Sequence, residues 1–270
     1  MASVRPFTER DGNMPIHRGK TMKLLLDTIV LRPYVFAFFL AFLLAGRGDL
    51  GWRRTLFFGA WVWPLAWLAE FASTRIGVPF GLYHYTGTTR GQEIYVDNVP
   101  LMDSLSFTFL AYAAFCLARV VLAGRAVSRV RLAIVSGLLM MLLDVVIDPL
   151  AVRGDRWFLG YIFYYPEGGA YFGVPLTNFA GWWIVGALGV GGCLWIWSDP
   201  NARWGGRAWP GVALYYGVLA FNLVMTAWIG EWMLAALGFA LHVALAVACV
   251  RFTRAAARPP SIVGEVAKGT

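Results

Sequence analysis

Charge is what this sequence lacks most. Only 14% of its 270 residues are Asp, Glu, Lys or Arg, whereas 59% are hydrophobic. Soluble domains carry about 25% charged residues, so more than a third of the usual charge is missing. Apolar stretches of around 20 residues indicate membrane-spanning helices. The composition therefore predicts an integral membrane protein and excludes a soluble one.

Lysine, histidine and cysteine are also scarce, and each scarcity excludes a class of protein. A retinal-type receptor needs a Schiff-base lysine inside a span, but the lysines here lie outside the apolar runs, at Lys20, Lys23 and Lys268. Three histidines are too few for a membrane iron oxygenase or desaturase. Three isolated cysteines form neither a disulfide framework nor a CxxC metal site. We expect no metal and no cofactor.

The net charge of +8 does not indicate nucleic-acid binding, because the basic residues lie in short loops and tails. Such charge sets membrane orientation. It places the C-terminus in the cytoplasm and predicts a multi-pass protein of the cell inner (cytoplasmic) membrane. The basic N-terminal segment disagrees with this orientation, which therefore stays open. Taken together, the loops at 47–54, 124–131 and 198–209 and the tail from Arg251 contain more Lys and Arg than the alternate loops at 75–98, 153–176 and Gly230.

The apolar runs predict an all-α, polytopic transmembrane helical bundle of about seven spans. Helices are expected because lipid leaves no partner for open backbone groups. The first span is an uncleaved helix that contains the apolar run 33–46, extended by the chain from Leu24. We expect one transmembrane domain over residues 24–252, flanked by disordered tails at 1–23 and 253–270. The other spans are expected at about 55–74, 99–123, 130–152, 177–197, 210–229 and 231–250.

Polar residues inside the predicted spans gather at one side of the membrane. Because successive spans run in opposite directions, a residue late in one span lies level with a residue early in the next. All the polar positions then fall in the same third of the membrane, together with two loops, 75–98 and 153–176, that are rich in Gly, Pro and Tyr. Charged groups in a span are costly, so the cluster predicts a site. Its members are Glu70, Asp103, Asp144, Asp148, Asn178, Asn222 and Glu231.

Some of these acids have a structural alternative, which is to cap a helix or to face water at the interface. Glu231 sits in a helix turn, so the structural role is favoured for this residue. For Asp103 the structural and functional roles are equally favoured. Glu70 and Asp144 lie about one and two turns inside their spans, where a functional role is favoured. His242 lies in the middle of a span without an evident partner and is interpreted as packing.

Asp144 and Asp148 are four residues apart, so their carboxylates share one helix face. Two carboxylates held together away from water do not both ionise easily, and one is expected to keep its proton at neutral pH. A protonated carboxylic acid is a general acid, and its ionised neighbour can accept a proton from water. Pro149 is expected to end or kink the helix beside them.

Several segments resemble one known family. They are Glu70 followed by GVPFGLYHY (77–85), VPL (99–101), DVVIDP (144–149) and YFGVPLTNFAGWW (171–183). Over about residues 60–250 the chain resembles the carotenoid 1,2-hydratases of the CruF type, membrane proteins of bacterial and archaeal carotenoid biosynthesis. The resemblance implies addition of water to the C1–C2 double bond of an acyclic carotenoid end group, which gives a tertiary alcohol. It implies neither a metal nor a redox cofactor.

This reaction suggests a role for each candidate residue. Asp144 or Asp148 would protonate the alkene, and an ionised partner, Glu70 or the other aspartate, would take a proton from the attacking water. Aromatic rings would stabilise the cation, and Asn178 would hold the water. Tyr and Trp also suit turns and interfaces, an alternative that stays open for the loop residues. The catalytic candidates are Asp144, Asp148, Glu70 and Asp103, and the substrate-binding candidates are Asn178, Tyr83, Tyr85, Tyr171 and Trp182.

Three other functions remain as alternatives. A carotenoid end-group cyclase begins with the same protonation but closes a ring. An intramembrane prenyltransferase could hold magnesium diphosphate on DxxxD, although such enzymes usually have two acidic motifs. A transporter or non-catalytic carotenoid carrier belongs to a different class, but the chain has no evident repeat. The expected partners are a membrane-embedded carotenoid, the lipid bilayer and other carotenoid-pathway enzymes.

Overall fold

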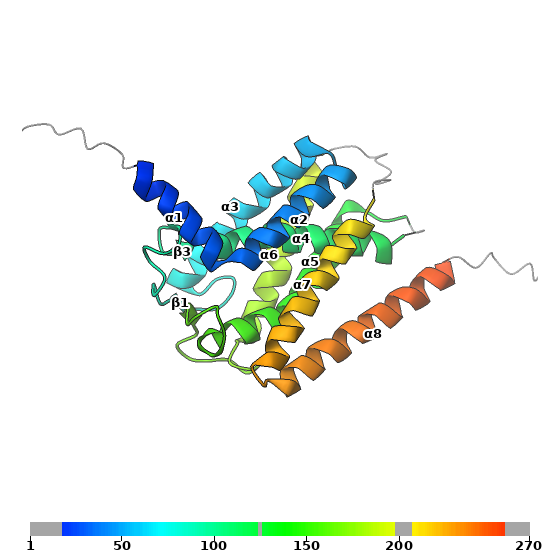
Figure 1. The fold of residues 1–270 in the computed structure, drawn as a ribbon. Helices are drawn as coiled ribbons and strands as arrows, with labels where there is room; N and C mark the ends of the chain where they lie inside the picture. The colour runs from blue at the N-terminus through cyan, green and yellow to red at the C-terminus, as the bar shows by residue number, and fades with distance from the viewer. Residues whose placement is uncertain (1–17, 124–125, 198–206, 257–270) are drawn as a thin grey trace, which may run out of the picture.

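The chain forms a bundle of α-helices (Figure 1). The computed structural model describes residues 18–123, 126–197 and 207–256, with side chains from 21 to 250. Six of the described helices are long and apolar enough to cross a membrane, and α1 with α2 makes a bent seventh candidate. This confirms the expected all-α polytopic bundle. The helices are α1 (Arg18–Leu31), α2 (Pro33–Asp49), α3 (Trp52–Ile76), α4 (Leu101–Val121), α5 (Arg129–Ala151), α6 (Leu176–Ile196), α7 (Trp209–Trp228) and α8 (Trp232–Ala256).

The limits of α3 to α7 fall within three residues of the expected spans, and the ends of the chain differ more. Helix α1 already begins at Arg18, inside the segment 1–23 that was expected to be disordered, and α8 continues to Ala256, past the expected limit at 252. Residues 1–17 and 257–270 of the two expected tails lie outside the described residues.

The expected first span is not one straight helix. Helices α1 and α2 meet at an angle of 90° at Arg32, so the chain from Leu24 does not continue α2 as a straight helix. The sequence explains the break, because a residue that precedes a proline disfavours the helical conformation. Arg32 has φ −123° and ψ 50°, and Pro33 then occupies the first turn of α2.

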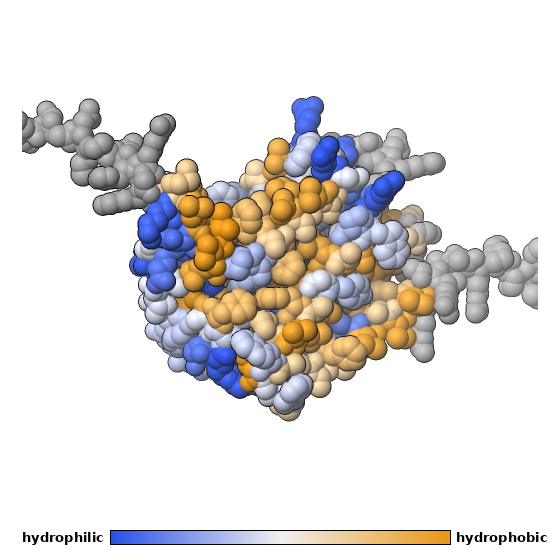
Figure 2. All heavy atoms as spheres, in the orientation of Figure 1, coloured by the Kyte–Doolittle hydropathy of each residue, from blue (hydrophilic) through white to orange (hydrophobic). Residues whose placement is uncertain are grey.

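Helix α4 lies at the centre of the bundle, in contact with α2, α3, α5 and α7. Within its apolar window 72% of the residues are buried, against 17% for α8, which lies at the edge (Figure 1). Apolar residues cover the face formed by α2, α7 and α8, and hydrophilic residues gather at its two ends (Figure 2). This band matches the arrangement that a bilayer requires.

Helices α5 and α6 approach each other closely because both carry glycine at the contact. A Cβ atom on Gly137 would overlap the backbone carbonyl of Trp183, and a Cβ on Gly186 would lie 3.0 Å from the Cα of Gly137. The close contact holds the second half of α5 against the first half of α6. It therefore brings Asp148 and Asn178 together across the two helices.

Two long loops cover one end of the bundle and are joined to each other. The first, between α3 and α4, contains β1 (His84–Tyr85), β2 (Tyr95–Val96) and β3 (Val99–Pro100), with β2 antiparallel to β3. The second, between α5 and α6, contains a 3₁₀ turn (Gly154–Arg156) and β4 (Phe163–Tyr164). Strand β1 pairs antiparallel with β4, so the two loops form one cover.

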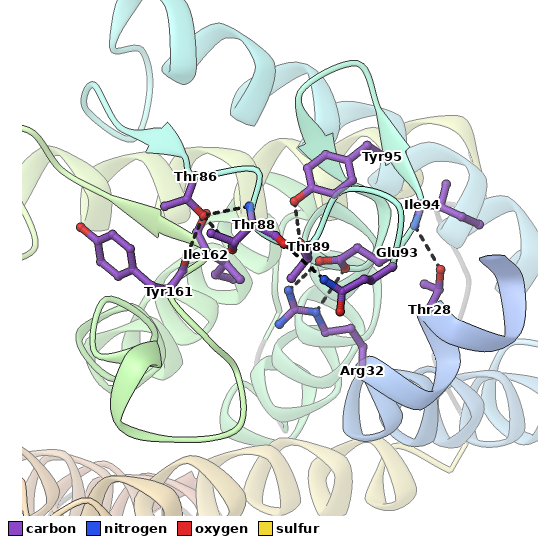
Figure 3. A network of polar contacts seen from close by, with 11 residues as sticks. Thr28, Arg32, Thr86, Thr88, Thr89, Glu93, Ile94, Tyr95, Tyr161 and Ile162 are labelled. Carbon is purple, nitrogen blue, oxygen red and sulfur yellow. Dashed lines mark hydrogen bonds and ion pairs between the residues drawn. The ribbon is translucent and has the colours of Figure 1, made fainter.

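A buried polar network ties this cover to the bend between α1 and α2 (Figure 3). The Arg32 Nε and Nη2 atoms donate to the Glu93 carboxylate at 3.2 and 2.8 Å, and both side chains are fully buried. The amide of Ile94 donates to the Thr28 hydroxyl at 3.0 Å. In the same network, Thr86 Oγ1 donates to the backbone carbonyl of Tyr161 at 2.6 Å. The first loop is thus fixed both to the bend and to the second loop.

Glu231, which was interpreted as a helix cap or an interface residue, forms ion pairs with two arginines of the second loop. It lies between α7 and α8, and its carboxylate accepts from Arg156 and lies 3.0 Å from Arg153 Nε. Burial alone would raise the pKa of Glu231, but the hydrogen bond from Arg156 and the charge of Arg153 lower it overall. The pairs anchor the second loop to the α7–α8 turn.

Because the folded-state pKa of Glu231 is lowered, this anchor is complete above the ordinary glutamate pKa of 4.5 and is lost as the pH falls through the lower folded value. We expect Glu231→Gln at neutral pH to increase hydrogen–deuterium exchange at residues 153–165. Acidification of the unsubstituted protein to about pH 4 should begin to have the same effect. Glu167→Gln, an exposed change in the same loop, is the control. Equal exchange in the two variants would contradict the anchoring role.

Candidate active site

One cavity lies between the helices under the two loops and has about 900 Å³ of empty space, counting its open part. Its wall includes Glu70 of α3, Asp103 of α4, Asp148 of α5, and Asn178 with Trp182 of α6. Asn222 of α7, another member of the polar cluster predicted from sequence, lines it too, so these polar groups come from five helices. Tyr83 and Tyr85 of the first loop also line it. The structure therefore brings together seven of the nine residues that the sequence analysis selected.

Asn178 connects the two aspartates. Its Nδ2 atom donates to Asp144 Oδ2 and to Asp148 Oδ2, at 2.7 Å each. The Asp148 Oδ2 atom also accepts a hydrogen bond of 3.2 Å from the Trp182 indole. Asp148 remains partly exposed and lines the cavity, whereas Asp144 is fully buried and does not. The amide nitrogen of Asn178 is thus engaged by both carboxylates, and its expected role of holding the water stays a prediction that would fall to its amide oxygen.

The remaining two acids lie on other walls of the cavity. Glu70 is 5% exposed, and its Oε2 atom has no hydrogen-bond partner among the described residues. Such a buried, unpartnered acceptor in a cavity wall is suited to a water molecule or a substrate hydroxyl. Asp103 is near enough to the Arg32 guanidinium to interact with it electrostatically. Arg32 therefore supplies positive charge close to a site that is otherwise acidic.

The tyrosines of the two loops remain neutral hydrogen-bond donors above the acids. Burial raises the pKa of Tyr83 and Tyr85 well above the ordinary value, and the charge of Glu70 raises both further. Burial and the neighbouring charges of Asp148 and Asp144 also raise the pKa of Tyr165. A phenol in such a place can donate to a carboxylate or to water but does not act as a base near neutral pH.

Tyr171 is not at the cavity. Its ring packs against Phe172 and Phe179, with ring centroids 4.8 and 5.5 Å apart. A tyrosine at the start of a loop segment can face either side, and the sequence did not distinguish the two. His242 packs as expected, with Nδ1 2.9 Å from the Gly238 carbonyl and Nε2 3.4 Å from the Tyr215 hydroxyl.

Other residues line the cavity that the sequence analysis did not select. Phe107 stacks on Trp182 with ring centroids 4.3 Å apart and an interplanar angle of 23°. Tyr165 and Trp157 reach the cavity from the second loop. Aromatic residues are so common in this chain that the sequence does not single out these three. For Phe107 alone, a spacing of one helical turn from Asp103 on α4 could have indicated a place beside the site.

The acids do not form an evident metal centre. Within residues 18–123, 126–197 and 207–256, no three His, Cys, Asp or Glu side chains converge closely enough to hold a metal ion. Carboxyl groups in a cavity with apolar and aromatic walls can donate and accept protons. Several carboxyl groups and aromatic rings that can stabilise positive charge line one space.

Fold and site together define a multi-pass membrane protein with a carboxylate-lined cavity at one end of the helical bundle. Residues 19–245 match the model of a family described as carotenoid biosynthesis protein. The chain belongs to this family.

One curated relative adds detail. The chain is 31% identical over 121 residues to the bisanhydrobacterioruberin hydratase of Haloarcula japonica. The match covers 45% of this chain and 38% of that protein, so it spans well under half of the relative's length. No solved structure matches.

Proposed function

We propose that this protein is a carotenoid 1,2-hydratase, which adds water to the C1–C2 double bond of an acyclic carotenoid end group. The observation that carries the proposal is the arrangement of Asp148, Asn178 and Trp182 in the wall of one cavity that also contains Glu70. The likeness to a hydratase supports the same reaction class. We further propose that it works in the cytoplasmic membrane, beside other carotenoid-pathway enzymes.

In the first step, Asp148 is the general acid. Because its Oδ2 atom accepts hydrogen bonds from Asn178 and Trp182, we assign the transferable proton to Oδ1 of this cavity-lining residue. Transfer of this proton to C2 forms the C–H bond and leaves a tertiary cation at C1. The two N–H donors stabilise the carboxylate that forms, which strengthens the acid. Asp144 does not line the cavity but accepts a hydrogen bond from Asn178, and it is a positioning residue in this mechanism.

In the second step, water captures the cation. The stacked rings of Trp182 and Phe107 present π-faces that stabilise positive charge until the water oxygen bonds to C1. Glu70 accepts the proton that the water loses, because its Oε2 atom is unpartnered among the described residues and lies in the cavity wall. Asp103 is the alternative acceptor. Glu70 then releases this proton to water and Asp148 regains one from water, so both carboxyl groups return to their starting states and the sum of the steps is one alkene and one water giving one alcohol.

Expression in a host that makes lycopene or a monocyclic carotene tests the proposal. We expect a pigment heavier by one molecule of water, with an unchanged polyene chromophore, by chromatography with mass spectrometry. An isomer of unchanged mass would indicate a cyclase instead. Unchanged pigments beside correctly inserted protein would contradict both enzymes and favour a prenyltransferase or a carrier.

A further inference from the structure

The cavity continues past the acids into an apolar extension. Its wall there is made of Phe38 of α2, Phe109 and Leu110 of α4, and Val218 and Phe221 of α7. Leu110 follows Asp103 by seven residues on α4, which is about 10 Å along the helix axis, and we take this length as the depth of the extension beyond the acids. Val218 lies ten residues before the end of α7, which places it about 15 Å deep and near the middle of a hydrocarbon layer roughly 30 Å thick.

Three aromatic rings close this extension on the side of α2 and α7. The Phe221 ring stacks on Tyr34, with centroids 5.0 Å apart and an interplanar angle of 18°, and meets Phe38 edge-on at 5.8 Å. All three rings line the cavity and are half-buried. We call these residues, Tyr34, Phe38 and Phe221, the aromatic seam. Helices α2 and α7 both cross the apolar face in Figure 2.

Outside the seam the two helices face lipid. Phe36 of α2 is 41% exposed and Val224 of α7 is 64% exposed. On the opposite wall, α5 and α6 are held in backbone contact at Gly137, which leaves no passage between them at that level. Above the acids lie the two polar loops. At the aromatic seam, half-buried side chains separate the apolar part of the cavity from the outer surface of α2 and α7.

We propose that the polyene chain of the substrate leaves the cavity sideways through the aromatic seam, between α2 and α7, and continues in the lipid. This inference rests on the proposed function. A carotenoid is about as long as the roughly 30 Å hydrocarbon layer, whereas the part of the cavity beyond the acids is about 10 Å deep. The rest of the chain therefore lies outside the protein. Flat aromatic rings suit contact with a flat conjugated chain.

Recognition is then limited to about the first third of the substrate. The far end group lies in lipid and makes no contact with the described helices. Substrates that share the reacting end but differ at the far end, by a ring or by a shorter chain, should show kcat/KM values within about tenfold of one another at equal membrane concentration. A loss above about a hundredfold on changing only the far end would overturn the inference.

Photo-crosslinking tests the path itself. Benzoylphenylalanine at Val224, one turn from Phe221 on α7, should capture carotenoid on irradiation. The same residue at Leu68, which is 55% exposed on α3 in the same half of the membrane, should not. Adducts are identified by mass. Equal capture at both positions, or capture at Leu68 alone, would overturn the path.

The two proposals fail in different ways. A hydrated product without an adduct at Val224 would leave the hydratase function standing and reject the path. An adduct at Val224 without any hydrated product would support the path and reject the hydratase function, making the protein a carotenoid-binding protein.

Discussion

Replacing Asp148 by Asn should reduce the turnover of carotenoid hydration by about 10²–10⁴-fold, the usual contribution of a positioned general acid. The amide is close in shape to the carboxyl group and its oxygen still accepts from Asn178 and Trp182, so the local packing is retained. What is lost is the acidic proton that reaches C2. The rate is measured in membranes or detergent, with protein amount determined separately.

Two further variants make this result specific. Asp144→Asn should reduce turnover less than Asp148→Asn, because Asp144 does not line the cavity and acts through Asn178. Asp97→Asn, on the exposed part of the first loop, should have no effect. Near-normal turnover in both Asp148→Asn and Asp144→Asn would remove the pair from the mechanism. A larger loss at Asp144 than at Asp148 would exchange their roles.

Replacing Glu93 by Ala should destabilise the folded protein by about 3–5 kcal/mol, the usual cost of leaving a buried charge without its partner. Glu93 accepts two hydrogen bonds from Arg32, and both side chains are fully buried. Arg32 Nη1 already has no hydrogen-bond partner among the described residues, so the change would leave the guanidinium poorly satisfied. Thermal unfolding in detergent measures the effect.

The chain offers a matched ion pair as the control. Asp97 and Arg75 pair at 3.1 Å between the same loop and α3, but their side chains are 53% and 40% exposed. Exposed pairs contribute at most about 1 kcal/mol. Asp97→Ala should therefore barely change the melting temperature. Similar melting temperatures for the two variants would show that the Arg32–Glu93 pair does not hold the loop to the bundle.

The spans and the depth of the site could be predicted from sequence because both depend on simple periodic features. A run of about 20 apolar residues must be a helix in lipid, and alternate spans run in opposite directions. The level of Glu70, Asp103, Asp148 and Asn178 therefore followed from their positions along the spans. The cavity that they share agrees with that expectation.

The rotation of each residue about its helix axis did not follow from sequence. Asp144 and Asp148 share a face, yet only Asp148 reaches the cavity, because the contact between Gly137 of α5 and α6 sets which part of that face is covered. The bend at Arg32 was also missed. Its partner Glu93 lies 61 residues away in a loop, a distance over which no local pattern carries information.

The most direct test of the central claim follows the atoms of water into the product. Purified protein is incubated with an acyclic carotenoid in D₂O, and in parallel in ¹⁸O-labelled water. The account predicts one deuterium at C2 and one ¹⁸O at C1 of the tertiary alcohol. With the Asp148→Asn variant, neither label should enter the carotenoid. Deuterium in a cyclised product without ¹⁸O, or an alcohol whose oxygen does not come from water, would contradict it.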